Sequence, residues 1–145
     1  MGIIALHPDY AQRVYDTQLN RILNTGTPGV IANQAIRIGN MLFRAGRPLL
    51  ALNLMKHALN HLLCVEDDLQ RDYAQNHYWP SNPDYLQWYD PWSARVSEAD
   101  ARRLAAHIDR LQDEISSNLG HTKRSNIRFR VHRYYERMFD DIYEV

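Results

Sequence analysis

Apolar residues recur along this chain at intervals of three and four positions, which is the period of an α-helix with one buried face. The pattern occupies five segments: from about Pro8 to Gly26, from Pro28 to Ala45, from Pro48 to about Tyr73, from Ser97 to about Asn118, and from Ser125 to about Tyr143. No segment shows the alternation of a half-buried strand. We therefore expect an all-α fold in which residues 1–145 form a single-domain antiparallel bundle of about five helices, with 97–119 and 125–143 as a C-terminal helical hairpin.

The third segment has the widest apolar surface. Its main stripe consists of Leu49, Leu52, Met55, Leu59 and Leu63, and a second apolar patch contains Leu50 and Leu54. A helix that is apolar on two sides is usually packed by several neighbours, so we expect this helix to be central. At the segment boundaries, Gly46 suits the left-handed residue that ends a helix. Ser97, followed three positions later by Asp100, resembles a capping box.

Residues 76–93 interrupt the helical pattern between the third and fourth helices and form an aromatic, proline-rich loop. The aromatic side chains are those of Tyr78, Trp79, Tyr85, Trp88, Tyr89 and Trp92, which include all three tryptophans of the chain. Loops of this length within a compact domain are uncommon and often functional. These side chains suit two roles, which are a lid over the helical core and a platform that binds peptides, sugars or stacked bases.

Composition narrows the class of protein. Lysine plus arginine and aspartate plus glutamate both number 17, so the zero net charge does not by itself favour nucleic acid as a partner. The single cysteine, Cys64, excludes an intrachain disulfide. The first residues do not resemble a secretory signal, and no apolar run reaches about 18 residues. We therefore expect a cytoplasmic protein that does not contact membranes.

Small residues occur where the second and third helices would face each other. They are Gly39, Ala51 and Ala58, and the larger residues beside them are Leu42 and Met55. Small contact residues allow two antiparallel helices to approach closely, while the larger ones fill the remaining space. With Gly46 at the turn, this pattern over residues 35–63 resembles one tetratricopeptide (TPR) repeat.

The TPR resemblance covers about a fifth of the chain and has two departures. Ala35 stands where tryptophan is common, and Leu63 stands near the usual closing proline. No second copy follows at the spacing of such repeats, so a generic helical hairpin explains the pattern equally well. If the repeat is genuine, the resemblance implies a scaffold that binds peptides or partner proteins, as TPR domains generally do.

Four residues on the third helix have the spacing of a metal site. His57, His61, Cys64 and Asp68 follow one another at intervals of four, three and four, so they share one side of a helix. Imidazole and thiolate are common ligands of zinc. The alternative is a half-exposed helix face that contains two histidines by chance.

A basic cluster marks the last helix. Its members are Lys123, Arg124, Arg128, Arg130, Arg133 and Arg137. Residues 123–137 therefore suit phosphate groups of a nucleic acid. The same arginines also suit an acidic partner, which is either another protein or the acidic segment 66–90 of this chain.

Arg102 and His107 are separated by four residues. This Arg-x4-His spacing resembles the motif of HEPN ribonucleases, which are helical and dimeric. The resemblance implies that His107 acts as acid or base and that Arg102 binds phosphate. Arg103 departs from the Asn, Asp or His usual at the position after the arginine.

Other enzyme and cofactor signatures are absent from the sequence, including a glycine-rich phosphate loop, a nucleophile elbow and a zinc-protease motif. The sequence therefore favours a non-catalytic interaction protein, such as an adaptor, a chaperone-like binder or an inhibitor of another protein. A zero net charge also suits a homodimer, because self-repulsion is weak. The alternatives are a nucleic-acid-binding helical protein, with or without HEPN-like cleavage, and a metal-binding helical bundle.

Overall fold

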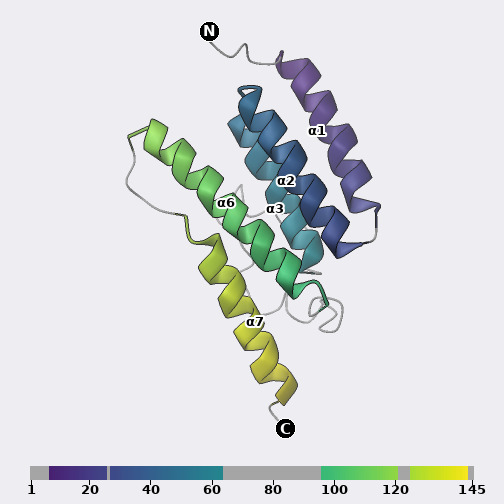
Figure 1. The fold of residues 1–145 in the computed structure, drawn as a ribbon, viewed down its shortest axis with the longest axis vertical. Coiled ribbons are helices and arrows are strands. Elements are labelled where there is room, and N and C mark those ends of the chain that lie inside the picture. Colours follow the sequence, from purple (N-terminus) through teal and green to yellow (C-terminus); the bar gives the residue numbers. More distant parts are fainter. Residues whose placement is uncertain (1–6, 26, 64–95, 121–124, 144–145) are drawn as a thin grey trace.

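The computed structural model describes residues 7–25, 27–63, 96–120 and 125–143, with side chains described as far as residue 137. These residues form five packed helices and no strand, which confirms the predicted all-α fold (Figure 1). The helices are α1 (Pro8–Leu23), α2 (Pro28–Arg44), α3 (Pro48–Leu62), α6 (Glu98–Asn118) and α7 (Ile127–Tyr143). Among the described residues, no helix has the length and apolar character that crossing a membrane requires.

The turn between α2 and α3 forms as the sequence predicts. Gly46 adopts a φ of 79°, in the left-handed region that favours glycine. This conformation lets the Arg47 N–H donate to the Leu42 carbonyl at 2.9 Å, which satisfies a carbonyl at the end of α2. Pro48, which follows directly, occupies the first position of α3, where its missing N–H costs no helix hydrogen bond.

The α2–α3 hairpin is packed closely at a glycine. A Cβ atom placed on Gly39 would lie 3.0 Å from the Met55 Cγ and closer still to its Cε. Ala51 and Ala58, on α3, are fully buried. The predicted contact through small residues is therefore present, with Gly39 admitting the Met55 side chain.

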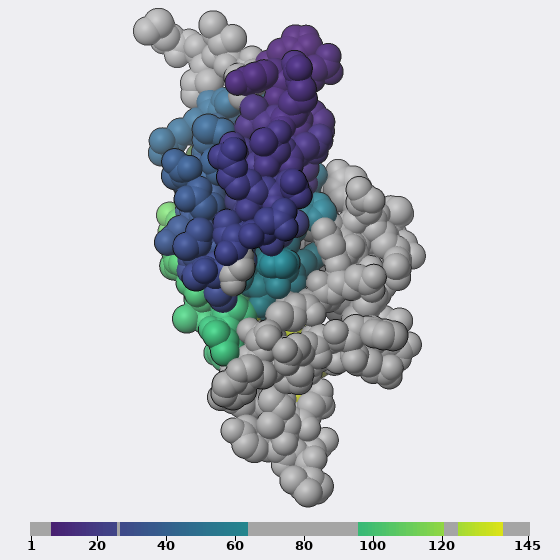
Figure 2. Space-filling model, turned by 90° about the vertical axis from the view of Figure 1, so that its right-hand side faces the viewer, coloured from purple at the N-terminus to yellow at the C-terminus, as the bar shows by residue number. Residues whose placement is uncertain are grey.

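Helix α3 lies at the centre of the bundle and packs against α1, α2 and α6. The buried residues of its stripe include Leu52, Met55, Leu59 and Leu63. Leu49 is an exception to the prediction, because its side chain is 62% exposed. It lies in the first turn of α3, where neighbouring helices do not cover it. Figure 2 shows α1 packed over α2 and α3.

Two helix ends differ in detail from the predictions. Helix α3 ends at Leu62, and the predicted continuation from Cys64 to about Tyr73 lies outside the described residues. Ser97 does precede α6, but its hydroxyl makes no capping hydrogen bond and donates instead to the Leu62 carbonyl. Asp100 accepts from Arg103 at 2.9 Å. The Ser97 hydroxyl thus connects the start of α6 to the end of α3. The last carbonyls of a helix have no partner within it, and this buried one is satisfied by the buried Ser97 hydroxyl.

Candidate partner-binding surface

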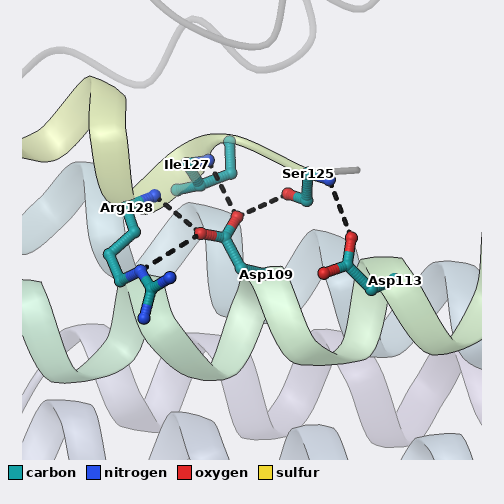
Figure 3. A network of polar contacts seen from close by, with 5 residues as sticks. All are labelled: Asp109, Asp113, Ser125, Ile127 and Arg128. Atoms are coloured by element: carbon teal, nitrogen blue, oxygen red, sulfur yellow. Dashed lines mark hydrogen bonds and ion pairs between the residues drawn. The ribbon is translucent and has the colours of Figure 1, made fainter. Parts of the chain in front are cut away.

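A buried carboxylate in the middle of α6 fixes the start of α7 (Figure 3). Asp109 is 8% exposed, and its Oδ1 accepts from the Ser125 hydroxyl and, at 2.8 Å, from the Ile127 N–H. Its Oδ2 accepts from the Arg128 N–H at 2.9 Å. The first N–H groups of a helix have no partner within the helix, so Asp109 caps α7 from a different helix. Its negative charge also lies at the positive end of the α7 dipole.

Two further contacts hold α7 against the bundle. Asp113, one turn beyond Asp109 on α6, accepts from the Ser125 N–H at 2.7 Å. At the other end of the contact, the Tyr134 hydroxyl donates to the Leu63 carbonyl at 2.7 Å, and both groups are buried. The α6–α7 pair is thus an antiparallel hairpin whose apolar seam includes Val131 and Tyr135.

Beside this network, α3 contributes a buried lysine. The Lys56 side chain is only 7% exposed, and its pKa is lowered from 10.5 to about 8, chiefly by burial. The nearby guanidinium of Arg130 contributes to this lowering, while the carboxylate of Asp109 partly offsets both effects. One turn along α3, the buried Asn60 Oδ1 accepts no hydrogen bond from the described residues.

The outward side of α7 combines cations with an apolar side chain. Phe129 is 60% exposed, although α7 buries its opposite side in the α6–α7 seam. Arg128, Arg133 and Arg137 are exposed on the same helix, with the Arg128 Nε 4.0 Å from the Asp109 carboxylate, and Arg130 is half-buried. We call these five residues the α7 surface. An exposed aromatic ring among guanidinium groups is typical of a binding surface, because aromatic and arginine side chains are enriched at interfaces.

Three other polar side chains border the α7 surface. His132 and Glu136 form an ion pair along the helix. Arg102 reaches from α6 with its guanidinium 3.2 Å from the His132 Nδ1 and 5.3 Å from the centre of the Tyr135 ring. Arg102 also pairs with Glu98 at 3.0 Å. This arginine therefore connects α6 to α7 through contacts that have a structural role.

The two residues of the HEPN-like motif have different surroundings. Arg102 faces α7, as described above, whereas the half-buried His107 lies near Arg103 and Arg110. The pKa of His107 is lowered chiefly by burial and then by these two arginines. Five positions on a helix correspond to a rotation of about 140°, which separates the two side chains. Within the described structure they do not form a joint site, so HEPN-like chemistry stays a prediction from spacing alone.

The metal-site residues are only partly covered by the structure. The half-buried His57 packs edge-on against Tyr15, with the ring centres 6.5 Å apart, and His61 is exposed. Cys64 and Asp68 lie outside the described residues. No group of three or more metal-ligating side chains occurs in the part of the chain that the structure describes. The predicted metal site therefore stays a prediction.

The aromatic loop of residues 76–93 also lies outside the described residues, as do Lys123 and Arg124. The lid and the binding platform therefore both stay predictions for this loop. Of the predicted partner-binding residues, the structure places the four arginines of the α7 surface on one helix. It adds Phe129, which the sequence pattern did not single out.

Asp109 and Lys56 were also missed by sequence reasoning. An aspartate within an amphipathic helix usually lies on the solvated face, so its capping of another helix has no local signal. Lys56 had a signal, because it stands between the apolar residues Met55 and Leu59 on a helix that is apolar on two sides.

Comparisons with known proteins identify no relative of this chain. It matches no protein-family model, no curated protein and no solved structure. Its function must therefore be inferred from its own residues.

Proposed function

We propose that this protein is a non-catalytic interaction module that binds an acidic segment of another protein on the α7 surface. The observation that carries the proposal is Phe129, which is 60% exposed on a helix held firmly by Asp109 and Tyr134. A rigid helix that presents an aromatic ring loses little conformational entropy on binding. The surrounding arginines favour carboxylates, which they bind through paired hydrogen bonds.

Two features favour an acidic protein over nucleic acid at the α7 surface. Phe129 and the carboxylate of Glu136 lie among the arginines, and a partner with both apolar and charged side chains complements such a mixture. The TPR-like pattern of residues 35–63 points in the same direction, since TPR domains generally bind peptides or proteins.

The proposal is tested by crosslinking with a matched control. A photoreactive phenylalanine analogue at position 129 should capture a protein segment rich in Asp and Glu from a lysate of the native host. The same analogue placed at position 10 is the control, because Tyr10 is an aromatic side chain that is 53% exposed on α1. It reports capture that any exposed aromatic side chain would give. The two captured sets are compared by quantitative mass spectrometry of the crosslinked peptides.

Substitution provides the second part of the test. The double variant Phe129→Ala/Arg133→Gln should lose the captured partner, with at least about a tenfold fall in affinity. Tyr10→Ala should retain it, and both variants should melt like the wild type. Equal capture at positions 129 and 10, or a captured segment without excess acidic residues, would contradict the proposal.

A further inference from the structure

A second cationic region lies on the edge of α6 that faces away from α7. Arg103, His107 and Arg110 follow one another at intervals of four and three, so they form one row along the helix. The two arginines are exposed, and His107 is half-buried between them. None of these residues contributes to the α7 surface.

Helix α2 runs beside this row in the same direction. The Arg103 guanidinium donates to the Asn33 side chain on α2, and one turn earlier Gly29 lies next to Asp100, whose Oδ1 would be 3.9 Å from an added Cβ. The exposed Arg37 lies one turn beyond Asn33 on α2, and its guanidinium donates to the Gln34 side chain at 3.0 Å. The region therefore draws cations from two helices.

Carboxylates compensate this charge only in part. Asp100 pairs with Arg103, and Glu114 lies one turn beyond Arg110 at the end of the row. Within the described structure, no hydrogen bond or ion pair joins Arg110 to another residue. The pKa of His107 is lowered chiefly by burial and then by Arg110 and Arg103, the two arginines on either side of it in the row.

We propose that the row formed by Arg103, His107 and Arg110, together with Arg37, binds the phosphates of a single-stranded nucleic acid. Arg103 and Arg110 are about 10 Å apart along the helix, because an α-helix rises about 1.5 Å per residue. A single phosphate does not span this separation, whereas successive phosphates of a strand do. Guanidinium groups bind phosphate through paired hydrogen bonds and also stack on bases.

The row of Arg103, His107 and Arg110 lies on a different face from the α7 surface, so binding there does not depend on the proposed protein partner. This row is also a different site from residues 123–137, where the sequence predicts possible binding of nucleic acid. The row formed by Arg103, His107 and Arg110 contains no exposed phenylalanine, tyrosine or tryptophan, and its cations are spaced along a line. A regularly charged strand complements this arrangement better than a mixed protein surface does.

The first measurement is fluorescence anisotropy with a labelled oligouridylate of about 12 nucleotides, within the site size of single-strand binders. We expect binding that weakens steeply between about 50 mM and about 200 mM salt, because bound phosphates release counterions. Arg103→Gln/Arg110→Gln should weaken binding at least about tenfold. The matched control Arg133→Gln/Arg137→Gln, which removes the same charge from α7, should change affinity less than about twofold.

A second readout does not depend on the Arg103 contacts with α2. The oligonucleotide should raise the pKa of His107 in the wild type, measured by NMR, because added phosphates stabilise the imidazolium. Arg37→Gln/Arg110→Gln, which keeps Arg103 in place, should also weaken binding. Absence of binding at low salt, an unchanged His107 pKa, or an equal loss in the α7 control would each overturn the inference. Displacement of the oligonucleotide by an equimolar acidic peptide would also overturn it.

Discussion

The two helical hairpins of this protein are held together by different physics. In the α2–α3 hairpin, small residues let the helices touch, and Gly39 admits the side chain of Met55. In the α6–α7 hairpin, the helices are joined by Asp109, a buried carboxylate that accepts three hydrogen bonds from the start of α7. Close packing depends on shape, whereas a buried carboxylate depends on complete hydrogen bonding. The second hairpin therefore concentrates its stability in a few atoms.

The sharpest test of this difference is Asp109→Ala. The substitution leaves the Ile127 and Arg128 N–H groups and the Ser125 hydroxyl without their acceptor. We expect the free energy of unfolding to fall by about 4 kcal/mol, as for breaking a buried charged network. Urea denaturation followed by circular dichroism measures the change.

Asp113→Ala is the matched control for Asp109→Ala. Asp113 accepts one hydrogen bond, from the Ser125 N–H, so its loss should cost about 1 kcal/mol. If the two variants lose similar amounts of stability, then α7 is held mainly by its apolar seam and the contrast between the hairpins disappears.

The next largest effect concerns Lys56, the buried cation beside Asp109. Its pKa is about 8 in the folded protein and ordinarily 10.5, so between these values the unfolded chain binds the proton more tightly. Unfolding then takes up a proton, and the stability of the wild type rises as the pH increases from about 8 to about 10.5. Relative to Lys56→Met, the gain should approach about 3 kcal/mol, because each pKa unit corresponds to about 1.4 kcal/mol.

Denaturation of both proteins at several pH values measures this gain. The chain contains only one other lysine, Lys123, and a Lys123→Met variant is the control for ordinary lysine titration. The prediction fails if the stability of the wild type relative to Lys56→Met stays constant or falls from pH 8 upward. The fold would then not lower the pKa of Lys56.

The last stability prediction tests the first hairpin. Gly39→Leu would place a bulky side chain where the Met55 side chain lies, so the helices must separate or Met55 must move. We expect a loss of about 2 kcal/mol, typical of overpacking. The double variant Gly39→Leu/Met55→Ala should recover part of this loss. If melting is unchanged in the single variant, the close approach is not a source of stability.

Much of the fold follows from the sequence, because helical periodicity is a local signal. The stripe of α2, with Ile31, Ala35, Ile38 and Leu42, is buried as its spacing predicts. Gly46 ends α2 as expected, since only its backbone conformation matters there. Leu49 was predicted to be buried and is exposed, because an apolar position at a helix end has no neighbour to cover it.

The candidate sites were harder to predict, because they depend on contacts between helices. Arg102 was selected for its spacing from His107, yet its contacts are with Glu98 and the ring of Tyr135 on α7. The basic cluster of α7 was visible in the sequence, but only the packing of the helix identifies Phe129 as the exposed ring among the arginines. Tertiary packing thus decides which polar residues are available for binding.

The Asp109 cap also has a consequence for the order of folding. A short helix that begins without a capping residue nucleates poorly in water. Because the acceptor for the first turn of α7 belongs to α6, residues 125–143 acquire their cap only when α6 is already helical and near. We therefore expect α7 to be the later helix of this pair to consolidate. Asp109→Asn should then accelerate unfolding more than it slows folding, since a contact that forms late is absent from the transition state.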